Sequence, residues 1–164
     1  MQLTERINAP LASSDVAQRW IVPGLVAGAA FLGFEMLAGA FSTSLWSFPQ
    51  AIVQSIGMGE PTTALEPTQL VAGVAIHMLF SIGLGVLFIA LAERLRLSGP
   101  KLLAAGVLFM WAESGISIWA VLHTLFPSTL PLLFAAVPVW ASVVGRTGFG
   151  VVLTVMYARL WRSS

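Results

Sequence analysis

The chain has 164 residues, of which 57% are hydrophobic and 9% are charged, and its formal net charge is +1. Soluble domains carry about 25% charged residues, so this composition predicts an integral membrane protein and excludes a separate soluble domain. The charge balance provides no basic block for nucleic-acid binding. The lack of cysteine excludes disulfides, thiolate metal sites and dithiol chemistry.

Four apolar runs predict four transmembrane helices, because a helix of about 20 residues spans about 30 Å of hydrocarbon. The first run follows a mixed polar segment and precedes three further runs, so we do not expect a cleaved signal peptide. The sequence therefore predicts one all-α domain over residues 1–164, an integral membrane four-helix bundle. The expected helices cover residues 20–41, 70–92, 102–124 and 138–160.

The two connections expected on the outer side, residues 42–69 and 125–137, contain apolar residues at helical spacing. In the first, FPQAIVQSIG follows this spacing after a proline suited to a helix start. The counterpart in the second, FPSTLPLLFAAVP, is more apolar. Each is either a short interfacial helix or an ordinary connection.

The basic residues predict the orientation. Lys and Arg lie before the first run, around the connection of the second and third, and after the fourth, but not in residues 42–69 or 125–137. The positive-inside rule then places both termini in the cytoplasm of a bacterial inner membrane. Tryptophans gather at membrane interfaces and fit this frame. Trp20 and Trp161 would mark the inner interface, and Trp46 and Trp140 the outer one.

The two halves of the chain are predicted to form an internal repeat. A shift of 78 positions pairs the intramembrane Glu35 with Glu113, together with the Phe-Pro sequence that follows each helix. A shift of 65 positions aligns the second helices and pairs Arg94 with Arg159. Each two-helix unit returns to its starting side, so the repeats are predicted to be parallel, related by an axis along the membrane normal.

Each apolar run contains one ionisable residue well inside it. An acid at the centre of a membrane helix costs roughly 2.5 to 3.5 kcal/mol, so such a residue is retained where a partner or a cavity receives it. Helical rise places the four residues between the outer half and the midplane, close enough in depth to meet. They are Glu35, His77, Glu113 and Arg146.

Small residues predict which helix faces pack. Gly24, Gly28 and Gly39 share a helical stripe with Glu35, and the first two form a Gly-x-x-x-Gly pair that lets membrane helices approach closely. Glycine and serine flank the other three polar residues as well, so we expect all four to converge on one interior. The predicted packing glycines are Gly24, Gly28, Gly39, Gly83, Gly85, Gly148 and Gly150.

The charges of this buried polar centre do not balance. Two glutamates against one arginine leave one negative charge, which a protonated His77, a protonated glutamate or a bound cation must neutralise. Three roles stay open. The centre could lock four helices in register, it could bind a cation, relay protons or contact a quinone, or it could be completed by a partner subunit.

A metal or a haem is a candidate ligand of this centre, and the sequence does not identify a cofactor. Glu35, His77 and Glu113 form a hard-ligand set that suits iron or manganese, and also zinc or copper, but no local spacing motif supports it. A bis-His haem would need His77 and His123 at similar depth, whereas helical rise places His77 roughly 9 Å deeper. His123 is expected at the outer interface.

The first apolar run contains GLVAGAAFLGFEMLAGAF, and it is followed by W.FP, IG.G, a histidine and a second glutamate-bearing helix. This combination resembles a group of small uncharacterised four-helix bacterial inner-membrane proteins. The resemblance covers mainly the first two membrane helices. It implies no activity, so no catalytic residue is transferred from it.

The predicted function is a small accessory or anchoring subunit of a larger membrane assembly, such as a respiratory or other redox complex. The sequence predicts almost no extramembrane mass and contains no nucleotide-binding motif and no nucleophile arrangement, so catalysis by the chain alone on a soluble substrate is not expected. Its partners would be membrane lipid and larger membrane-protein subunits. The alternatives are a proton or small-cation transporter that uses the buried centre and a metal- or haem-binding oxidoreductase subunit.

Overall fold

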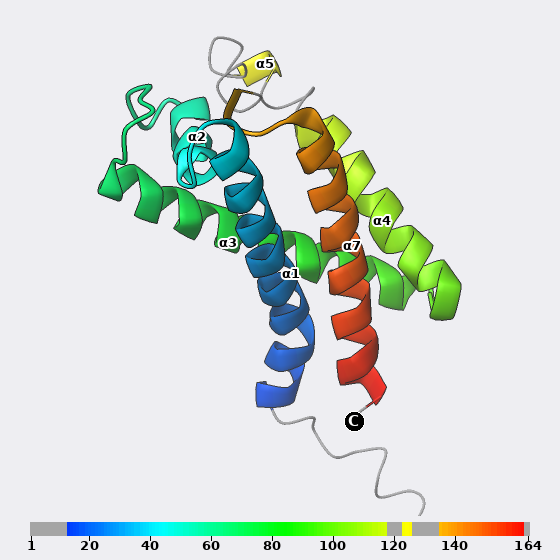
Figure 1. The fold of residues 1–164 in the computed structure, drawn as a ribbon. Coiled ribbons are helices and arrows are strands. Elements are labelled where there is room, and N and C mark those ends of the chain that lie inside the picture. Colours follow the sequence, from blue (N-terminus) through cyan, green and yellow to red (C-terminus); the bar gives the residue numbers. More distant parts are fainter. Residues whose placement is uncertain (1–12, 118–122, 126–134, 163–164) are drawn as a thin grey trace, which may run out of the picture.

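The computed structural model describes residues 13–117, 123–125 and 135–162, and the regular structure in these ranges is helical, without a strand (Figure 1). Elements far apart in sequence lie side by side, because α1 packs against both α3 and α7. The helices are α1 (Ser13–Ser42), α2 (Ser47–Ser55), α3 (Pro67–Arg94), α4 (Gly99–Gly115), α5 (His123–Leu125) and α7 (Val139–Arg162).

Three of the described helices are long and apolar enough to cross a membrane, over Ala17–Ser42, Pro67–Arg94 and Val139–Leu160. The prediction of a helical chain with membrane-length helices is confirmed for the described residues. α1 and α3 begin before the apolar runs, at Ser13 and Pro67, and Pro67 suits the first position of a helix because its φ is fixed near the helical value. The run expected at 102–124 corresponds to α4, which continues as a π-helical turn at residues 116 and 117. Residues 118–122 of that run lie outside the described part.

The connection between α3 and α4 is a tight turn. Its geometry is a Schellman motif, in which Arg96 N donates to Glu93 O at 3.1 Å and Leu97 N donates to Ala92 O at 2.9 Å. Arg96 adopts a left-handed conformation, with φ of 52°. α3 and α4 are therefore close at this turn, but along the rest of their described lengths they contact each other little, whereas α4 packs mainly on α7.

Two helix pairs cross at glycines, α1 with α3 and α4 with α7. A Cβ added to Gly85 would lie 2.6 Å from the Cα of Gly24, and one added to Gly150 would lie 2.6 Å from the carbonyl oxygen of Gly106. These spacings leave no room for a side chain, so the backbones of each pair pack directly.

The other predicted packing glycines divide into two groups. Gly28 lies against Ser81 of α3, and a Cβ added to Gly39 would lie 2.7 Å from Ser47 Oγ. Gly83 and Gly148 do not lie at such contacts. Each is exposed, and an added Cβ would meet no atom of the described residues within 4 Å. Two positions along a helix turn it by roughly 200°, so Gly83 and Gly148 face away from the buried Gly85 and Gly150.

α2 lies within residues 42–69, where the sequence predicted either a short interfacial helix or an ordinary connection. It packs against α3, where Gly73 leaves room for the Pro49 carbonyl. The buried Gln50 then holds the following segment: its Nε2 donates to Ala64 O at 3.0 Å and its Oε1 accepts from Glu66 N at 2.8 Å. Most of the second connection, 125–137, lies outside the described residues.

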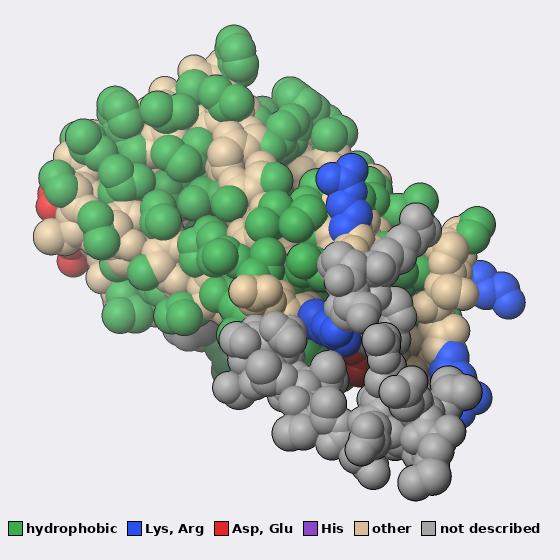
Figure 2. Space-filling view, turned by 90° about the horizontal axis from the view of Figure 1, so that it is seen from below, with side chains coloured by type: hydrophobic (Ala, Val, Ile, Leu, Met, Phe, Trp, Pro, Cys, Tyr) green, Lys and Arg blue, Asp and Glu red, His purple; other side chains and the backbone are tan. Residues whose placement is uncertain are grey.

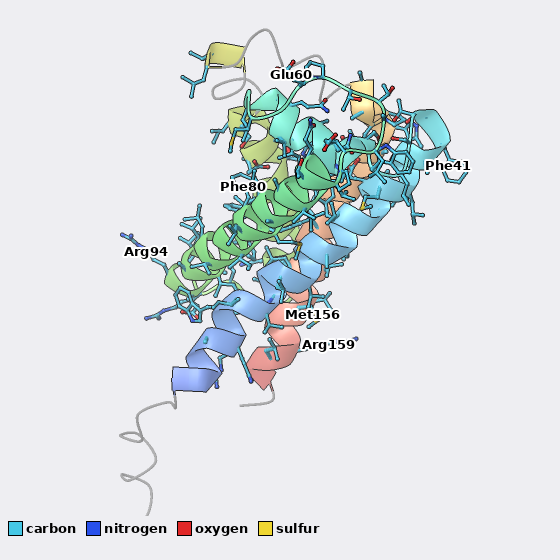
Figure 3. All side chains as sticks on the ribbon, turned by 90° about the vertical axis from the view of Figure 1, so that its left-hand side faces the viewer. Phe41, Glu60, Phe80, Arg94, Met156 and Arg159 are labelled. Atoms are coloured by element: carbon cyan, nitrogen blue, oxygen red, sulfur yellow. The ribbon has the colours of Figure 1, made fainter. Side chains whose placement is uncertain are left out.

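The charged side chains are distributed unequally between the two ends. Figure 3 shows Arg94 and Arg159 toward one end of the long helices and Glu60 at the other. Viewed from below, hydrophobic side chains cover most of the described surface, and Lys and Arg side chains gather on one side of it (Figure 2). The long helices therefore have apolar outer faces and basic residues near one end.

Candidate functional site

Glu35 lies in the contact between α1 and α7. It is 0% exposed, and both carboxylate oxygens are buried without a hydrogen-bond partner among the described residues. Gly145 of α7 makes room for it, since a Cβ added there would lie 2.7 Å from Glu35 Oε1. Arg146, the next residue along α7, interacts electrostatically with the carboxyl group.

His77 of α3 is also buried, but it has partners. Its Nε2 lies 3.1 Å from the carbonyl oxygen of Gly28 on α1. A carbonyl oxygen only accepts, so Nε2 carries a proton and donates to it. The ring packs on Phe31 and Phe48, with ring centroids 5.4 and 5.8 Å away. His77 thus joins α3 to α1 by a hydrogen bond and by aromatic contact.

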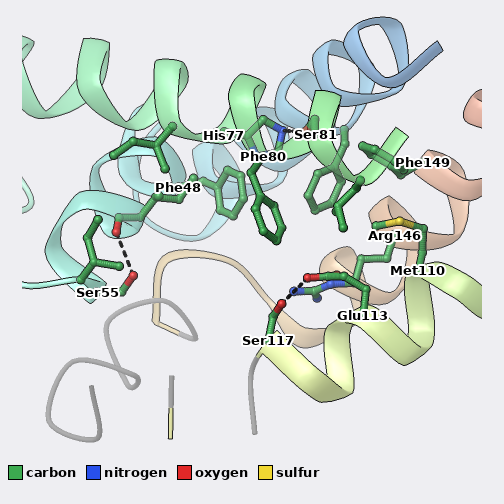
Figure 4. A pocket seen from close by; sticks show the side chains of 15 residues that line it. Phe48, Ser55, His77, Phe80, Ser81, Met110, Glu113, Ser117, Arg146 and Phe149 are labelled. Carbon is green, nitrogen blue, oxygen red and sulfur yellow. Dashed lines mark hydrogen bonds between the residues drawn. The ribbon is translucent and has the colours of Figure 1, made fainter. Parts of the chain in front are cut away.

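Glu113 of α4 and Arg146 of α7 are half-buried. Ser117 Oγ donates a hydrogen bond to Glu113 Oε1. Figure 4 shows the Arg146 side chain directed toward the side chains of Glu113 and Ser117. The α4–α7 side of the molecule therefore presents one acidic and one basic group next to a hydroxyl group.

A cavity of about 240 Å³ lies between these two groups of residues. His77, Glu113 and Arg146 line it together with apolar and aromatic side chains. Glu35 does not line it and lies beyond Phe31, one helical turn away. Of the four polar residues expected to converge, three share the cavity and the fourth lies in the neighbouring helix contact.

The structure does not bring the suggested metal ligands together. No group of three His, Asp or Glu side chains that could hold a metal ion occurs within residues 13–117, 123–125 and 135–162. Glu113 lines the cavity whereas Glu35 does not, and His77 Nε2 already donates to the Gly28 carbonyl oxygen. For the haem alternative, the side chain of His123 lies outside the described part.

The tryptophans expected at the interfaces occur toward the helix ends. Trp20 packs against the buried cluster that contains Ala27 and Phe88. Trp46 Nε1 donates to Thr63 O at 3.2 Å, and Trp140 is 61% exposed with its ring edge-to-face on Phe34. The side chain of Trp161 lies outside the described part.

Sequence reasoning missed two features of the site. One is Gly145. It follows Ala141 by four residues, a spacing of small residues typical of a packed helix face, and both residues are buried in the structure. The other is the aromatic wall of the cavity, which Phe31, Phe80 and Phe149 form with His77. Phenylalanine is common in membrane helices, so the sequence alone did not distinguish these rings from lipid-facing ones.

Comparison of the chain with protein-family models, with curated proteins and with solved structures gives no match.

Proposed function

We propose that this protein is a small membrane-embedded subunit that anchors or assists a larger membrane assembly, such as a respiratory or other redox complex. The observation that carries the proposal is the outer surface of the packed helices α1 and α7. At Gly33 and Gly148 an added Cβ would meet no described atom within 4 Å, and large apolar side chains flank both positions. Small residues on apolar helix faces favour close helix packing in membranes, which suits a transmembrane helix of a larger subunit.

The proposal includes a topology. We infer a four-helix bundle in a bacterial inner membrane, built from two parallel hairpins, with both termini cytoplasmic. Two observations support it: basic side chains occur near one end of the long helices, and each hairpin has its own glycine crossing, Gly24 with Gly85 and Gly106 with Gly150. A cysteine-accessibility map of the two ends in intact cells tests this orientation.

Extraction from native membranes in mild detergent, followed by native mass spectrometry, tests the subunit role. The wild-type chain is expected to carry stoichiometric larger subunits. Gly148→Leu should release them, because the leucine fills the proposed contact, whereas Thr63→Leu, at an exposed position in the connection between α2 and α3, serves as the control and should not. Recovery of the wild type only as a lone monomer or homo-oligomer would contradict the proposal.

A second candidate, translocation of protons or small cations, is favoured by Glu35. A fully buried carboxyl group without a described hydrogen-bond partner, next to Arg146, is typical of a group that exchanges a proton or a cation within the membrane. In liposomes with an entrapped pH dye, Glu35→Gln is expected to abolish flux while the exposed control Glu66→Gln retains it. Absence of flux in the wild type would exclude this candidate.

A further inference from the structure

The cavity, which residues of α1, α2, α3, α4 and α7 line, is large enough for a small ring compound. A cavity of about 150 Å³ lined by apolar side chains accommodates benzene, so the 240 Å³ observed here accommodates a ring with several substituents. The apolar walls exclude a strongly hydrated ligand, since they offer no hydrogen bonds to replace its water.

The walls are arranged on two sides with different chemistry. Figure 4 shows Phe48, His77 and Phe80 on one side of the cavity and Glu113 and Arg146 on the other. The aromatic side offers ring faces and edges against which a flat ligand packs. The polar side offers guanidinium N–H donors, which suit carbonyl oxygens. A ligand that fills both sides is a flat ring with hydrogen-bond acceptors on its edge.

The formal charges of the cavity select against an ionic ligand. Glu113 and Arg146 carry opposite charges and both line it. Among the residues that line the cavity these two formal charges offset each other, so an ionic head would add a charge without a counter-ion to a largely apolar cavity, which is costly. A neutral head adds no charge to it.

Residues of both α3 and α4 line the cavity, and these two helices contact each other little in the described chain. Phe80, which lines the cavity, is 52% exposed. α3 is of membrane length, so the exposed part of this ring would face the hydrocarbon. A ligand dissolved in the lipid would enter from the side, and any long apolar tail would remain among the lipid chains.

We propose that this cavity binds the head of a neutral, lipid-soluble ring compound with carbonyl oxygens, the chemistry of a quinone. Arg146 donates hydrogen bonds to a carbonyl oxygen, and the phenylalanine rings pack against the head. The proposal concerns the binding of a ligand by this chain and does not depend on a partner subunit.

Titration of the full chain in lipid nanodiscs with a decyl-substituted benzoquinone tests this site, with calorimetry against empty nanodiscs as the reference. Saturable binding with one site per chain is expected. Arg146→Gln should weaken it about ten-fold or more, because it removes a charged hydrogen-bond donor. Arg159→Gln, which changes a basic residue of the same helix outside the cavity, should leave binding unchanged.

A second pair of variants tests the site independently if Arg146→Gln does not fold. Phe80→Ala removes an exposed ring that lines the cavity, and Leu79→Ala removes a neighbouring exposed side chain that does not line it. Weakened binding in Phe80→Ala alone supports the site. The proposal is overturned if the quinone does not bind above the level of empty nanodiscs, or if Phe80→Ala and Leu79→Ala lose equal affinity for it. It is also overturned if oleate displaces the quinone and binds more tightly, because the cavity would then prefer an anionic ligand.

Discussion

The carboxylate of Glu35 on α1 packs directly against the backbone of Gly145 on α7. A Cβ added at Gly145 would lie 2.7 Å from Glu35 Oε1 and 2.6 Å from a ring carbon of Phe31. Two helices from opposite ends of the chain therefore meet where one has a glycine and the other has its buried acid. This contact also keeps Glu35 apart from the cavity that the other three polar residues line.

Gly145→Ala is expected to lower the free energy of unfolding by about 1–3 kcal/mol, because the added methyl group overlaps the buried Glu35 side chain and the partly buried Phe31 ring. Gly148→Ala is the matched control, since it lies on the same helix with no described atom near an added Cβ. Helix propensity should leave its stability unchanged or raise it by up to about 1 kcal/mol. Unfolding in mixed micelles with increasing denaturing detergent measures both, and equal effects would contradict this packing.

The crossing of α1 and α3 gives a second matched pair, Gly85→Ala and Gly83→Ala. At Gly85 the obstacle is the backbone of Gly24, which cannot rotate away, whereas Gly83 faces outward. Thermal unfolding in detergent should show a clearly lower Tm for Gly85→Ala and no decrease for Gly83→Ala. A lower Tm for both would mean that the outer face of α3 is also a packing surface.

Substitutions of His77 should separate its hydrogen bond from its packing. His77→Phe keeps a ring against Phe31 and Phe48 but loses the bond to Gly28 O, so a loss of about 0.5–1.5 kcal/mol is expected. His77→Ala also leaves a void, and its loss should reach about 2–5 kcal/mol. Denaturation of the two variants side by side measures this order, and equal losses would indicate that the ring contributes little packing.

Gln50→Ala should loosen residues 57–66 without unfolding the membrane helices. The substitution removes the acceptor for Glu66 N and the donor to Ala64 O, so local opening of this segment becomes easier. Hydrogen exchange followed by mass spectrometry should show roughly ten-fold faster exchange there, a difference of about 1.4 kcal/mol. The exposed Glu60→Gln serves as the control, and unchanged exchange in Gln50→Ala would show that other contacts hold the segment.

The sequence identified helices of membrane length and an ionisable residue within each apolar run. Hydropathy is a local property, and a helix satisfies its own backbone hydrogen bonds, so an apolar run of sufficient length determines a membrane helix without reference to its neighbours. The same reasoning predicted the depths of the polar residues, because rise along a helix is fixed. It did not set the helix ends, which depend on individual capping residues and turns.

Only the tertiary structure decided which of these residues meet. Glycines in Gly-x-Gly pairs look equivalent in sequence, yet Gly85 and Gly150 lie in helix crossings while Gly83 and Gly148 face outward. The helices are apolar on nearly every side, so no hydrophobic stripe marks the packed face. In a membrane, lipid is as apolar as a neighbouring helix, and the choice of face depends on how the shapes and polar groups of two helices fit together. That fit placed Glu35 against α7 and His77, Glu113 and Arg146 around the cavity.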